Sequence, residues 1–245
     1  MTAQEPRSRS LRVPRRAVLF GAGALAAGAA GAGAAQAVAR SSPASSPTRD
    51  TAQIPPTEDL MREHGVLKRV LLVYRELIRR FEAGEQLPAR HLHHAALIIH
   101  DYIEGFHEGL EEGYVFPRLR QAGQLTGTVN TLLVQHARGR ELTQLILSGA
   151  TPDGAARAGV GARLAAAMTA FDRMYEPHEA REDTVVFPAF RRIVPAKELA
   201  DLGQHFAELE NQQFGTGGFA SMVGRVAEIE RALGIYDLGQ FTPQT

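Results

Sequence analysis

One eleven-residue pattern occurs twice in this chain. It spans residues 107–117 and again residues 178–188, and both copies read His-Glu-x-x-Glu-acid-x-x-Val-Phe-Pro. A lone histidine precedes each copy at nearly the same offset, as His64 and His136. An internal repeat means that one structural unit has been used more than once. The sequence therefore predicts two matching helical hairpins, each with a lone histidine and a His-x-x-x-Glu pair.

The hydrophobic residues around these motifs recur at helical spacing. They predict a first helix over about 57–81, a second over 89–120, a third that contains His136, and a fourth from about Arg157 to Ile193. Long amphipathic helices with short links are typical of an up-down-up-down four-helix bundle. We expect an all-α fold with this bundle at residues 57–193.

The rest of the chain falls outside this bundle. Residues 195–245 predict a helical C-terminal extension that packs on the bundle, and residues 38–56 are rich in Ser, Pro and Ala, as in a flexible linker. Pro177 lies inside the predicted fourth helix, where it should bend the helix or open a turn.

The N-terminal segment has the features of an export signal. Residues 1–37 hold five arginines and one acidic residue, followed by an apolar run rich in Gly and Ala and by a small-x-small pattern that ends at Ala37. The pair Arg15-Arg16 resembles a twin-arginine signal, which the bacterial export machinery recognises. We therefore expect an exported protein, periplasmic or extracellular. A retained membrane anchor is the alternative, if the signal is not cleaved.

Charge and cysteine content exclude several kinds of site. Beyond residue 37 the chain carries 22 basic and 26 acidic side chains without a basic stripe, so nucleic acid is not an expected partner. The chain has no cysteine, which excludes disulfides, thiolate metal sites and cysteine nucleophiles. Any metal must be held by histidines and carboxylates.

Residues four apart lie on one face of an α-helix, so each His-x-x-x-Glu pair points two donor groups in one direction. Imidazole nitrogen with carboxylate oxygen suits iron, manganese or zinc. Four histidines and two glutamates are too many for a single zinc ion, and they suit two metals bridged by carboxylates. The candidate metal ligands are His64, His107, Glu111, His136, His178 and Glu182.

This order of residues, His, His-x-x-x-Glu, His, His-x-x-x-Glu, resembles the His-His-Glu cation-binding branch of the hemerythrin-like family over about residues 57–193. The resemblance implies a non-haem di-iron centre inside the bundle, with Glu111 and Glu182 as bridges and manganese or zinc as alternative metals. It also implies that the protein binds, senses or reacts with dioxygen or a related small species. It favours a metal- and oxygen-binding protein over a dedicated enzyme, and no catalytic residue is assigned.

Two positions depart from the oxygen carriers of that family. The place of their fifth histidine, four residues after the third-helix histidine, is Arg140 here. The carriers also end in His-x-x-x-x-Asp, and Asp183 stands five residues after His178, which makes it a reserve ligand behind Glu182. These departures make redox, nitric oxide or peroxide chemistry, or iron handling, alternatives to reversible oxygen carriage.

Two other hypotheses remain open. The histidines could be packing residues of a metal-free helical interaction module. A ferritin-like oxidase or storage protein would need Glu-x-x-His pairs on facing helices. Glu104 and His107 have that spacing, but Tyr175 stands at the matching place before His178.

The remaining polar residues near the motifs have structural or supporting roles in this interpretation. Glu108, Glu112 and Glu179 are expected to be solvated or to orient the ligating imidazoles. His100 and Glu104 are expected in a supporting shell or in the core. We expect a structural role for His205 and a solvated helix terminus for the histidines at positions 91, 93 and 94.

Overall fold

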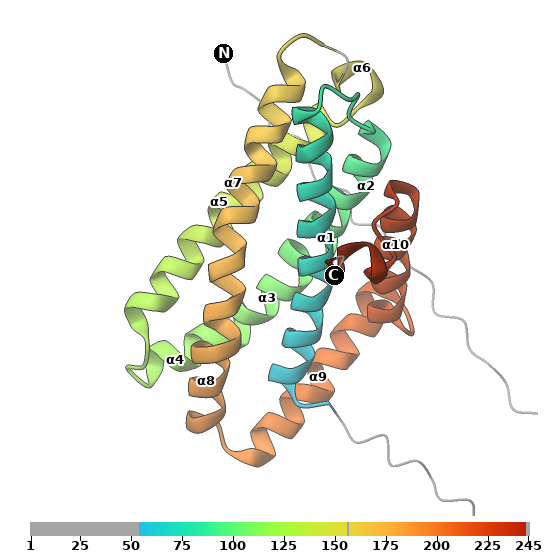
Figure 1. The fold of residues 1–245 in the computed structure, drawn as a ribbon. Helices are drawn as coiled ribbons and strands as arrows, with labels where there is room; N and C mark the ends of the chain where they lie inside the picture. Colours follow the sequence, from blue (N-terminus) through green and yellow to red (C-terminus); the bar gives the residue numbers. More distant parts are fainter. Residues whose placement is uncertain (1–53, 156, 244–245) are drawn as a thin grey trace, which may run out of the picture. The chain divides into compact units, whose positions relative to one another are not determined.

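The computed structural model describes residues 54–155 and 157–243, and every regular element in that part of the chain is helical (Figure 1). For this part of the chain the prediction of an all-α fold is confirmed. The predicted signal at residues 1–37 and the predicted linker up to residue 53 lie outside the described residues. None of the helices in the described ranges is long and apolar enough to cross a lipid bilayer.

Helix α1 (Pro56–Glu82) carries the first lone histidine, His64. Pro56 occupies the first turn, where its missing N–H costs no helical hydrogen bond. Glu58 and Asp59 follow in the first turn and arginines fill the last turn, so both ends complement the helix dipole.

The second long segment, residues 89–121, is continuously helical, but its hydrogen-bond pattern alternates between α and π. Its parts are α2 (Ala89–Ile98), η1 (Ile99–His107), α3 (Glu108–Leu110), η2 (Glu111–Val115) and α4 (Phe116–Gln121). The third and fourth long segments consist of α5 (Thr126–Gly149), α6 (Pro152–Ala155), α7 (Val160–Arg181), η3 (Glu182–Val186) and α8 (Phe187–Ile193).

The prolines of the two motifs account for two of the π turns, η2 and η3. A proline inside a helix clashes with the carbonyl group four residues back. Pro117 and Pro188 each lie just beyond a π turn, and the phenylalanine before each proline donates its N–H to the carbonyl five residues back, on Glu111 or Glu182. The wider turn relieves the clash, and π turns of this kind are frequent at functional sites.

One sequence-based expectation for the fourth segment was wrong in detail, and one of two alternatives for Pro177 is excluded. The helix starts at Val160 and not near Arg157, because Gly159 adopts a left-handed conformation (φ 77°) that glycine tolerates best. No turn opens at Pro177, which lies within continuous α-helix. Helix α7 packs along both α1 and α5, and these contacts offset the hydrogen bond that the proline removes.

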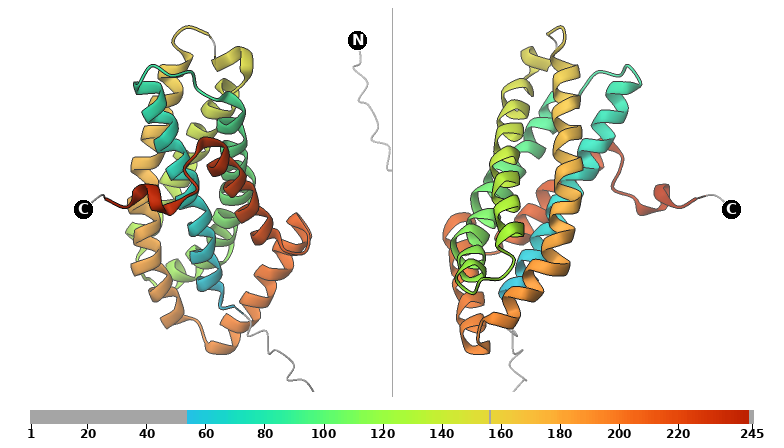
Figure 2. Two further views of the ribbon diagram at one scale, coloured as in Figure 1. Left: turned by 45° about the vertical axis from the view of Figure 1, so that its right-hand side comes forward. Right: turned by 90° about the vertical axis from the view of Figure 1, so that its left-hand side faces the viewer.

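The long segments enclose a common interior. Helix α7 lies against α1 and α5, and η1 also contacts both α1 and α5 (Figure 2). Aromatic side chains from three of the segments, such as Tyr74, Tyr102 and Phe171, are completely buried there.

The C-terminal residues form α9 (Ala196–Phe214), α10 (Gly218–Leu233) and the short 3-10 helix η4 (Leu238–Phe241). Helices α9 and α10 contact α1, and α10 also contacts α2. Arg69 on α1 donates Nε to Glu230 on α10 at 2.9 Å, and Glu230 is buried. The second nitrogen of the guanidinium, Nη2, donates to the other oxygen of the same carboxylate, so the pair is bidentate.

Candidate metal centre

The six side chains that the motif singled out lie together in the interior. They are His64 on α1, His107 at the end of η1, Glu111 on η2, His136 on α5, His178 on α7 and Glu182 on η3. Each is at most 4% exposed. Within two overlapping groups the donor atoms all lie within 4.8 Å of one another, and these groups are His64-His107-Glu111-Glu182 and His136-His178-Glu182.

The four histidines form two pairs. The ring centroids of His64 and His107 are 4.6 Å apart, and those of His136 and His178 are 5.0 Å apart. In the second pair the two Nε2 atoms face each other at 3.2 Å. We call His64 and His107 the first half-site, and His136 and His178 the second half-site.

Each glutamate lies between the two half-sites. Oε2 of Glu182 is 3.4 Å from Nε2 of His64 and 3.2 Å from Nε2 of His178. Oε2 of Glu111 has the same relation to the other two histidines, at 3.6 Å from His107 and 3.5 Å from His136. Each carboxylate thus contacts one histidine of each half-site, as a carboxylate that bridges two cations must.

The outer nitrogen of every ring has its own partner. The Nδ1 contacts are His64 with Asp183 at 2.7 Å, His107 with Glu63 at 2.7 Å, His136 with Glu112 at 2.9 Å and His178 with Gln135 at 2.9 Å. Carboxylate and amide oxygens accept hydrogen bonds, so Nδ1 is the donor in each contact and a neutral ring keeps its lone pair on Nε2. Partners of this kind orient imidazoles toward a metal and make them more basic.

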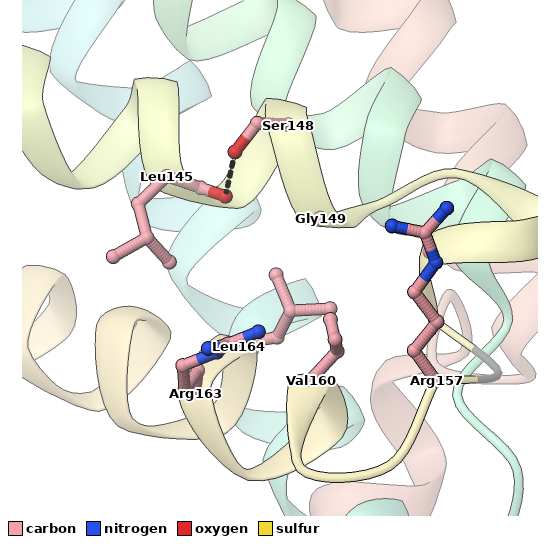
Figure 3. A pocket seen from close by; sticks show the side chains of 8 residues that line it. Leu145, Ser148, Gly149, Arg157, Val160, Arg163 and Leu164 are labelled. Carbon is pink, nitrogen blue, oxygen red and sulfur yellow. Dashed lines mark hydrogen bonds between the residues drawn. The ribbon is translucent and has the colours of Figure 1, made fainter.

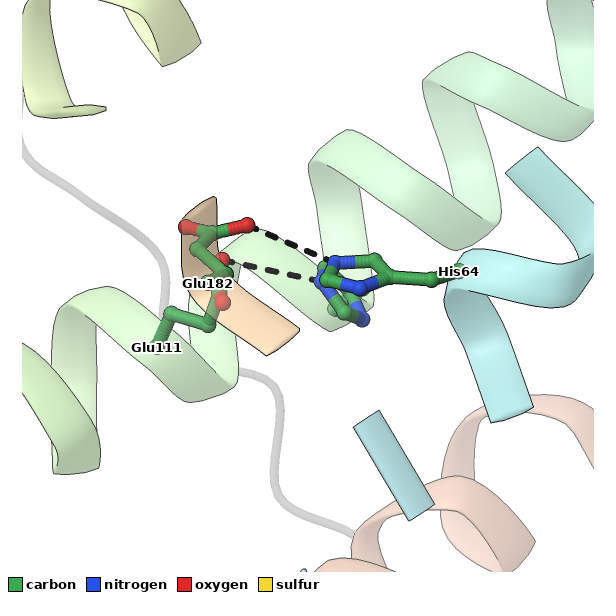
Figure 4. Close-up of side chains that lie close together, drawn as sticks. His64, Glu111 and Glu182 are labelled. Atoms are coloured by element: carbon green, nitrogen blue, oxygen red, sulfur yellow. Dashed lines mark ion pairs between the residues drawn. The ribbon is translucent and has the colours of Figure 1, made fainter. Parts of the chain in front are cut away.

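The inner atoms of the cluster fit a bound cation. In residues 54–155 and 157–243, both oxygens of Glu111, both oxygens of Glu182 and Nε2 of His107 are buried without a hydrogen-bond partner. Figure 4 shows the carboxylates of Glu111 and Glu182 converging with His64. A buried polar atom without a partner is destabilising, and a charged one more so. Cations between these oxygens and nitrogens would satisfy all five atoms together.

The pKa values of the cluster show how protons compete with a cation. Burial and the Glu182 carboxylate raise the pKa of Glu111 well above its usual range. At His107, burial and the neighbouring His64 lower the pKa well below its usual range. Burial also lowers the pKa of His64, but the hydrogen bond to Asp183 and the nearby Glu182 carboxylate outweigh it and raise the pKa to about 9. A metal must therefore displace protons from Glu111 and His64, so metal affinity falls as the pH falls.

The two departures from the oxygen-carrier pattern both lie outside the inner cluster. Asp183 accepts the Nδ1 hydrogen bond of His64 and points away from the centre. Arg140, at the place of the fifth histidine, donates Nη2 to Glu108 at 2.6 Å and to Glu112 at 2.7 Å. Glu112 therefore orients an imidazole, as expected, whereas Glu108 is buried in an ion pair.

A second ion pair, which was not predicted, repeats this contact on the other side. Lys68 stands four residues after the lone histidine of its repeat, as Arg140 does in the second repeat. Its Nζ lies 2.8 Å from buried Glu179. Glu108 and Glu179 each follow a motif histidine, so the cation of each repeat neutralises the buried acid of the other repeat. The equal spacing of Lys68 and Arg140 from the two lone histidines is the sequence signal that could have predicted this ion pair.

Tyr175 lies beside the second half-site. Its hydroxyl donates to Oε1 of Glu108 at 2.6 Å, and its ring centroid is 5.1 Å from that of His178. Gly139 on α5 leaves room for the tyrosine, because a Cβ atom at that position would lie 2.1 Å from the hydroxyl oxygen.

We expect Gly139→Ala to lower the free energy of unfolding by about 1–3 kcal/mol, because the added methyl group overpacks this contact. The better helix propensity of alanine offsets about 1 kcal/mol of that loss. Denaturant unfolding measures the difference. Gly127→Ala is the matched control on the same helix, since a Cβ atom there meets nothing within 4 Å. Equal stability of the two variants would show that Tyr175 moves away freely.

Glu104, which the sequence assigned to a supporting shell or the core, is buried. His100, which was assigned with it, is exposed, so that part of the expectation was wrong. Burial is the main cause that raises the pKa of Glu104 to about 7, against a usual 4.5. The folded state therefore holds this proton more tightly than the unfolded state. The stability associated with the proton is complete below about pH 4.5 and is lost as the pH rises to about 7.

We therefore expect Glu104→Gln to stabilise the metal-free protein at pH 8 by up to about 3 kcal/mol, at roughly 1.4 kcal/mol per pKa unit. At pH 5 the gain should shrink to below about 1 kcal/mol. Denaturant unfolding at both pH values tests this. Exposed Glu58 provides the control, and Glu58→Gln should change stability little at either pH. A gain at Glu104 that does not depend on pH would contradict the buried-acid explanation.

Other histidines and cavities lie apart from the cluster. The ring of His205 pairs with the hydroxyl of Tyr114 at 2.8 Å, and His94 at the start of α2 is exposed. A cavity of about 360 Å³ lies between α5 and the start of α7 (Figure 3). Its lining includes Arg157 and Arg163 but no histidine or carboxylate.

Comparison with known proteins places this cluster in a family context. The family model described as the hemerythrin HHE cation-binding domain matches residues 56–190. Uncharacterized proteins of Mycobacterium bovis and of two strains of Mycobacterium tuberculosis are each 51% identical over 204 residues, which cover 83% of this chain and 80% of theirs. No solved structure matches the chain.

Proposed function

The chain belongs to the hemerythrin HHE cation-binding domain family, and from that premise we propose that it is a non-haem di-iron protein that binds, senses or reacts with dioxygen or a related small species. Membership implies a metal cation, typically iron, and the described residues contain His/Glu groups that could hold metal ions. One observation carries the proposal. Among the described residues, the four oxygens of Glu111 and Glu182 find no hydrogen-bond partner, although they are buried between two pairs of histidines.

In this proposal each half-site holds one iron. His64 and His107 would hold one ion, the second half-site would hold the other, and Glu111 and Glu182 would be shared between them. The contacts of each glutamate with one histidine from each half-site support this division. Two nitrogens and two bridging oxygens leave coordination positions for water or a small gas molecule.

The bound irons would supply the electrons for chemistry with an oxygen species, and the chain would supply orientation and a dry environment. Phe187 stacks on His64 with ring centroids 5.7 Å apart, and Phe116 stacks on His136 at 5.6 Å. These are the phenylalanines of the two Val-Phe-Pro segments, and each covers a histidine of the other repeat. Both are at most 2% exposed, so they shield the imidazoles from water.

Redox chemistry with peroxide or nitric oxide is the second candidate for the reaction. It is favoured by Arg140, which stands at the place of a fifth histidine and forms ion pairs instead of facing the inner cluster. With one nitrogen donor fewer, the second iron would have an additional open position.

We further propose that the segments at 56–82, 89–121, 126–149 and 160–193 form the up-down-up-down bundle typical of the family, with α9 and α10 as an extension. Residues 1–37 would direct the protein through twin-arginine export to the periplasm or the exterior, and residues 38–55 would link the signal to the bundle, since α1 already begins at Pro56. That export route accepts folded proteins, which suits a cofactor inserted before export. An uncleaved signal would leave the protein anchored in the membrane.

The metal content of purified protein that lacks residues 1–37 tests this proposal. Elemental mass spectrometry should find about two irons per chain, and the optical spectrum of the reduced protein should change on exposure to dioxygen or peroxide. A folded protein without metal, whose stability does not respond to chelators, would overturn the proposal. The histidines would then be packing residues of a metal-free interaction module.

A further inference from the structure

The two half-sites differ in the partners of their outer nitrogens. The repeat places Glu63 and Gln135 at equivalent positions, each directly before the lone histidine of its copy. Each accepts a hydrogen bond from the motif histidine of its own repeat, His107 or His178. Nearly identical geometry therefore provides a carboxylate in one half-site and a neutral amide in the other.

The carboxylate contact is the shorter and the more buried of the two. Glu63 Oε2 lies 2.7 Å from Nδ1 of His107, and both residues are at most 2% exposed. Gln135 Oε1 lies 2.9 Å from Nδ1 of His178, and Gln135 is only half-buried. When Glu63 is ionised, its negative charge is poorly screened by water where it contacts the ring.

The Nδ1 partner of the other histidine in each half-site increases the difference in charge between the two half-sites. Asp183 accepts from His64, and in the described part of the chain it has no second hydrogen-bond or ion-pair partner. Glu112 accepts from His136, but the same oxygen also accepts from Arg140 at 2.7 Å. Arg140 shares its one positive charge between Glu108 and Glu112, the carboxylate that serves the second half-site. Lys68, its counterpart in the first repeat, pairs with Glu179 instead.

The charges around the two half-sites are therefore unequal. The imidazoles of the first half-site donate to two carboxylates. Those of the second donate to one carboxylate that shares its charge with a guanidinium and to one amide. An imidazole that donates to a carboxylate is a more basic ligand, and nearby negative charge attracts a divalent cation.

We propose that the two half-sites bind divalent cations with unequal affinity and fill in order, the first half-site before the second, and that Glu63 and Gln135 set this order. The inference rests on the proposed two-metal function. It adds which ion binds more tightly and which residues outside the inner cluster decide it.

Titration of the metal-free protein with Co²⁺, followed by calorimetry and by visible absorption, tests the order. Wild type should show two binding events with dissociation constants at least about tenfold apart. His107→Ala should remove the tighter event and His178→Ala the weaker event, which assigns each event to a half-site.

Exchanging the hydrogen-bond partners Glu63 and Gln135 then tests whether they cause the unequal affinities. Glu63→Gln should weaken the tighter event by about 10–100-fold and leave the weaker event in place. Gln135→Glu should strengthen the weaker event, so that the two affinities approach each other. Both changes are nearly isosteric, and circular dichroism checks the fold. Glu58→Gln on the same helix and exposed Gln124→Glu are matched controls, neither of which should shift either event.

The possible outcomes distinguish failure of the ordered filling from failure of the proposed two-metal function. Two events of equal affinity in wild type, or equal weakening of both events by Glu63→Gln, would overturn the ordered filling while leaving the two-metal site intact. If wild type binds no Co²⁺ and contains no iron, the proposed function itself fails and the ordered filling fails with it.

Discussion

The double substitution His107→Ala/His178→Ala is expected to lower the iron content of the purified protein by more than about 100-fold. Loss of one outer-shell partner typically costs 10–100-fold in metal affinity, and this variant removes a direct nitrogen donor from each half-site. In the proposed two-metal site each ion would then be left with one imidazole, too few to hold it. Elemental mass spectrometry of protein purified alongside wild type measures the loss.

His100→Ala is the matched control for this variant. His100 lies on the same π-helical segment as His107 but is exposed, and its Nδ1 contacts Asp101. It should keep the full metal content. Because alanine leaves a cavity in a buried cluster, His107→Gln/His178→Gln provides a better-filled version if the alanine variant does not fold. Stoichiometric iron in a folded double variant would end the assignment of these residues as ligands.

Removal of the metal is expected to lower the melting temperature by on the order of 10 °C. A ligand that binds only the folded state, at about 1,000 times its dissociation constant, adds about 4 kcal/mol of stability. For a domain of this size each kcal/mol corresponds to about 2–4 °C. The loss follows because Glu111 and Glu182 then keep their buried oxygens without partners. Differential scanning calorimetry before and after reduction and chelation measures it.

The same scan on His107→Ala/His178→Ala distinguishes the effect of metal loss on the melting temperature from any effect of the chelator itself. That variant should melt at the same temperature with and without chelator, since it has no metal to lose. If the melting temperature of wild type is also unchanged by chelator, protons alone must satisfy the buried polar atoms of the cluster. In that case Glu111 and His64, whose pKa values are raised, would hold protons in place of a metal.

The helices were largely predictable because their signals are local. Apolar spacing, Pro56 at the start of α1 and the acidic first turn of that helix all lie within the segment that they specify. The start of α7 was misplaced by three residues, because it depends on the backbone conformation of Gly159. The turn allowed for at Pro177 did not form, for a related reason. Its effect depends on the contacts of α7 with α1 and α5, which lie far away in the sequence.

The inner cluster was predictable in its membership because repetition provides information that a single motif lacks. One His-x-x-x-Glu pair occurs on many helices, but two pairs in register with two lone histidines select six residues. Spacing along a helix also explains why Glu182 points inward. Asp183, one residue further on, turns away and instead supports His64.

The sequence by itself thus determined the helices, the repeat and the inner donor atoms, since each depends on residues within a few turns of one helix or on the comparison of two copies. Only the tertiary structure decided which outer partner each histidine has and which cation neutralises Glu108 and Glu179. It also decided that Gly139 makes room for Tyr175. These contacts join different helices, so they depend on how the helices pack, which helical periodicity does not specify.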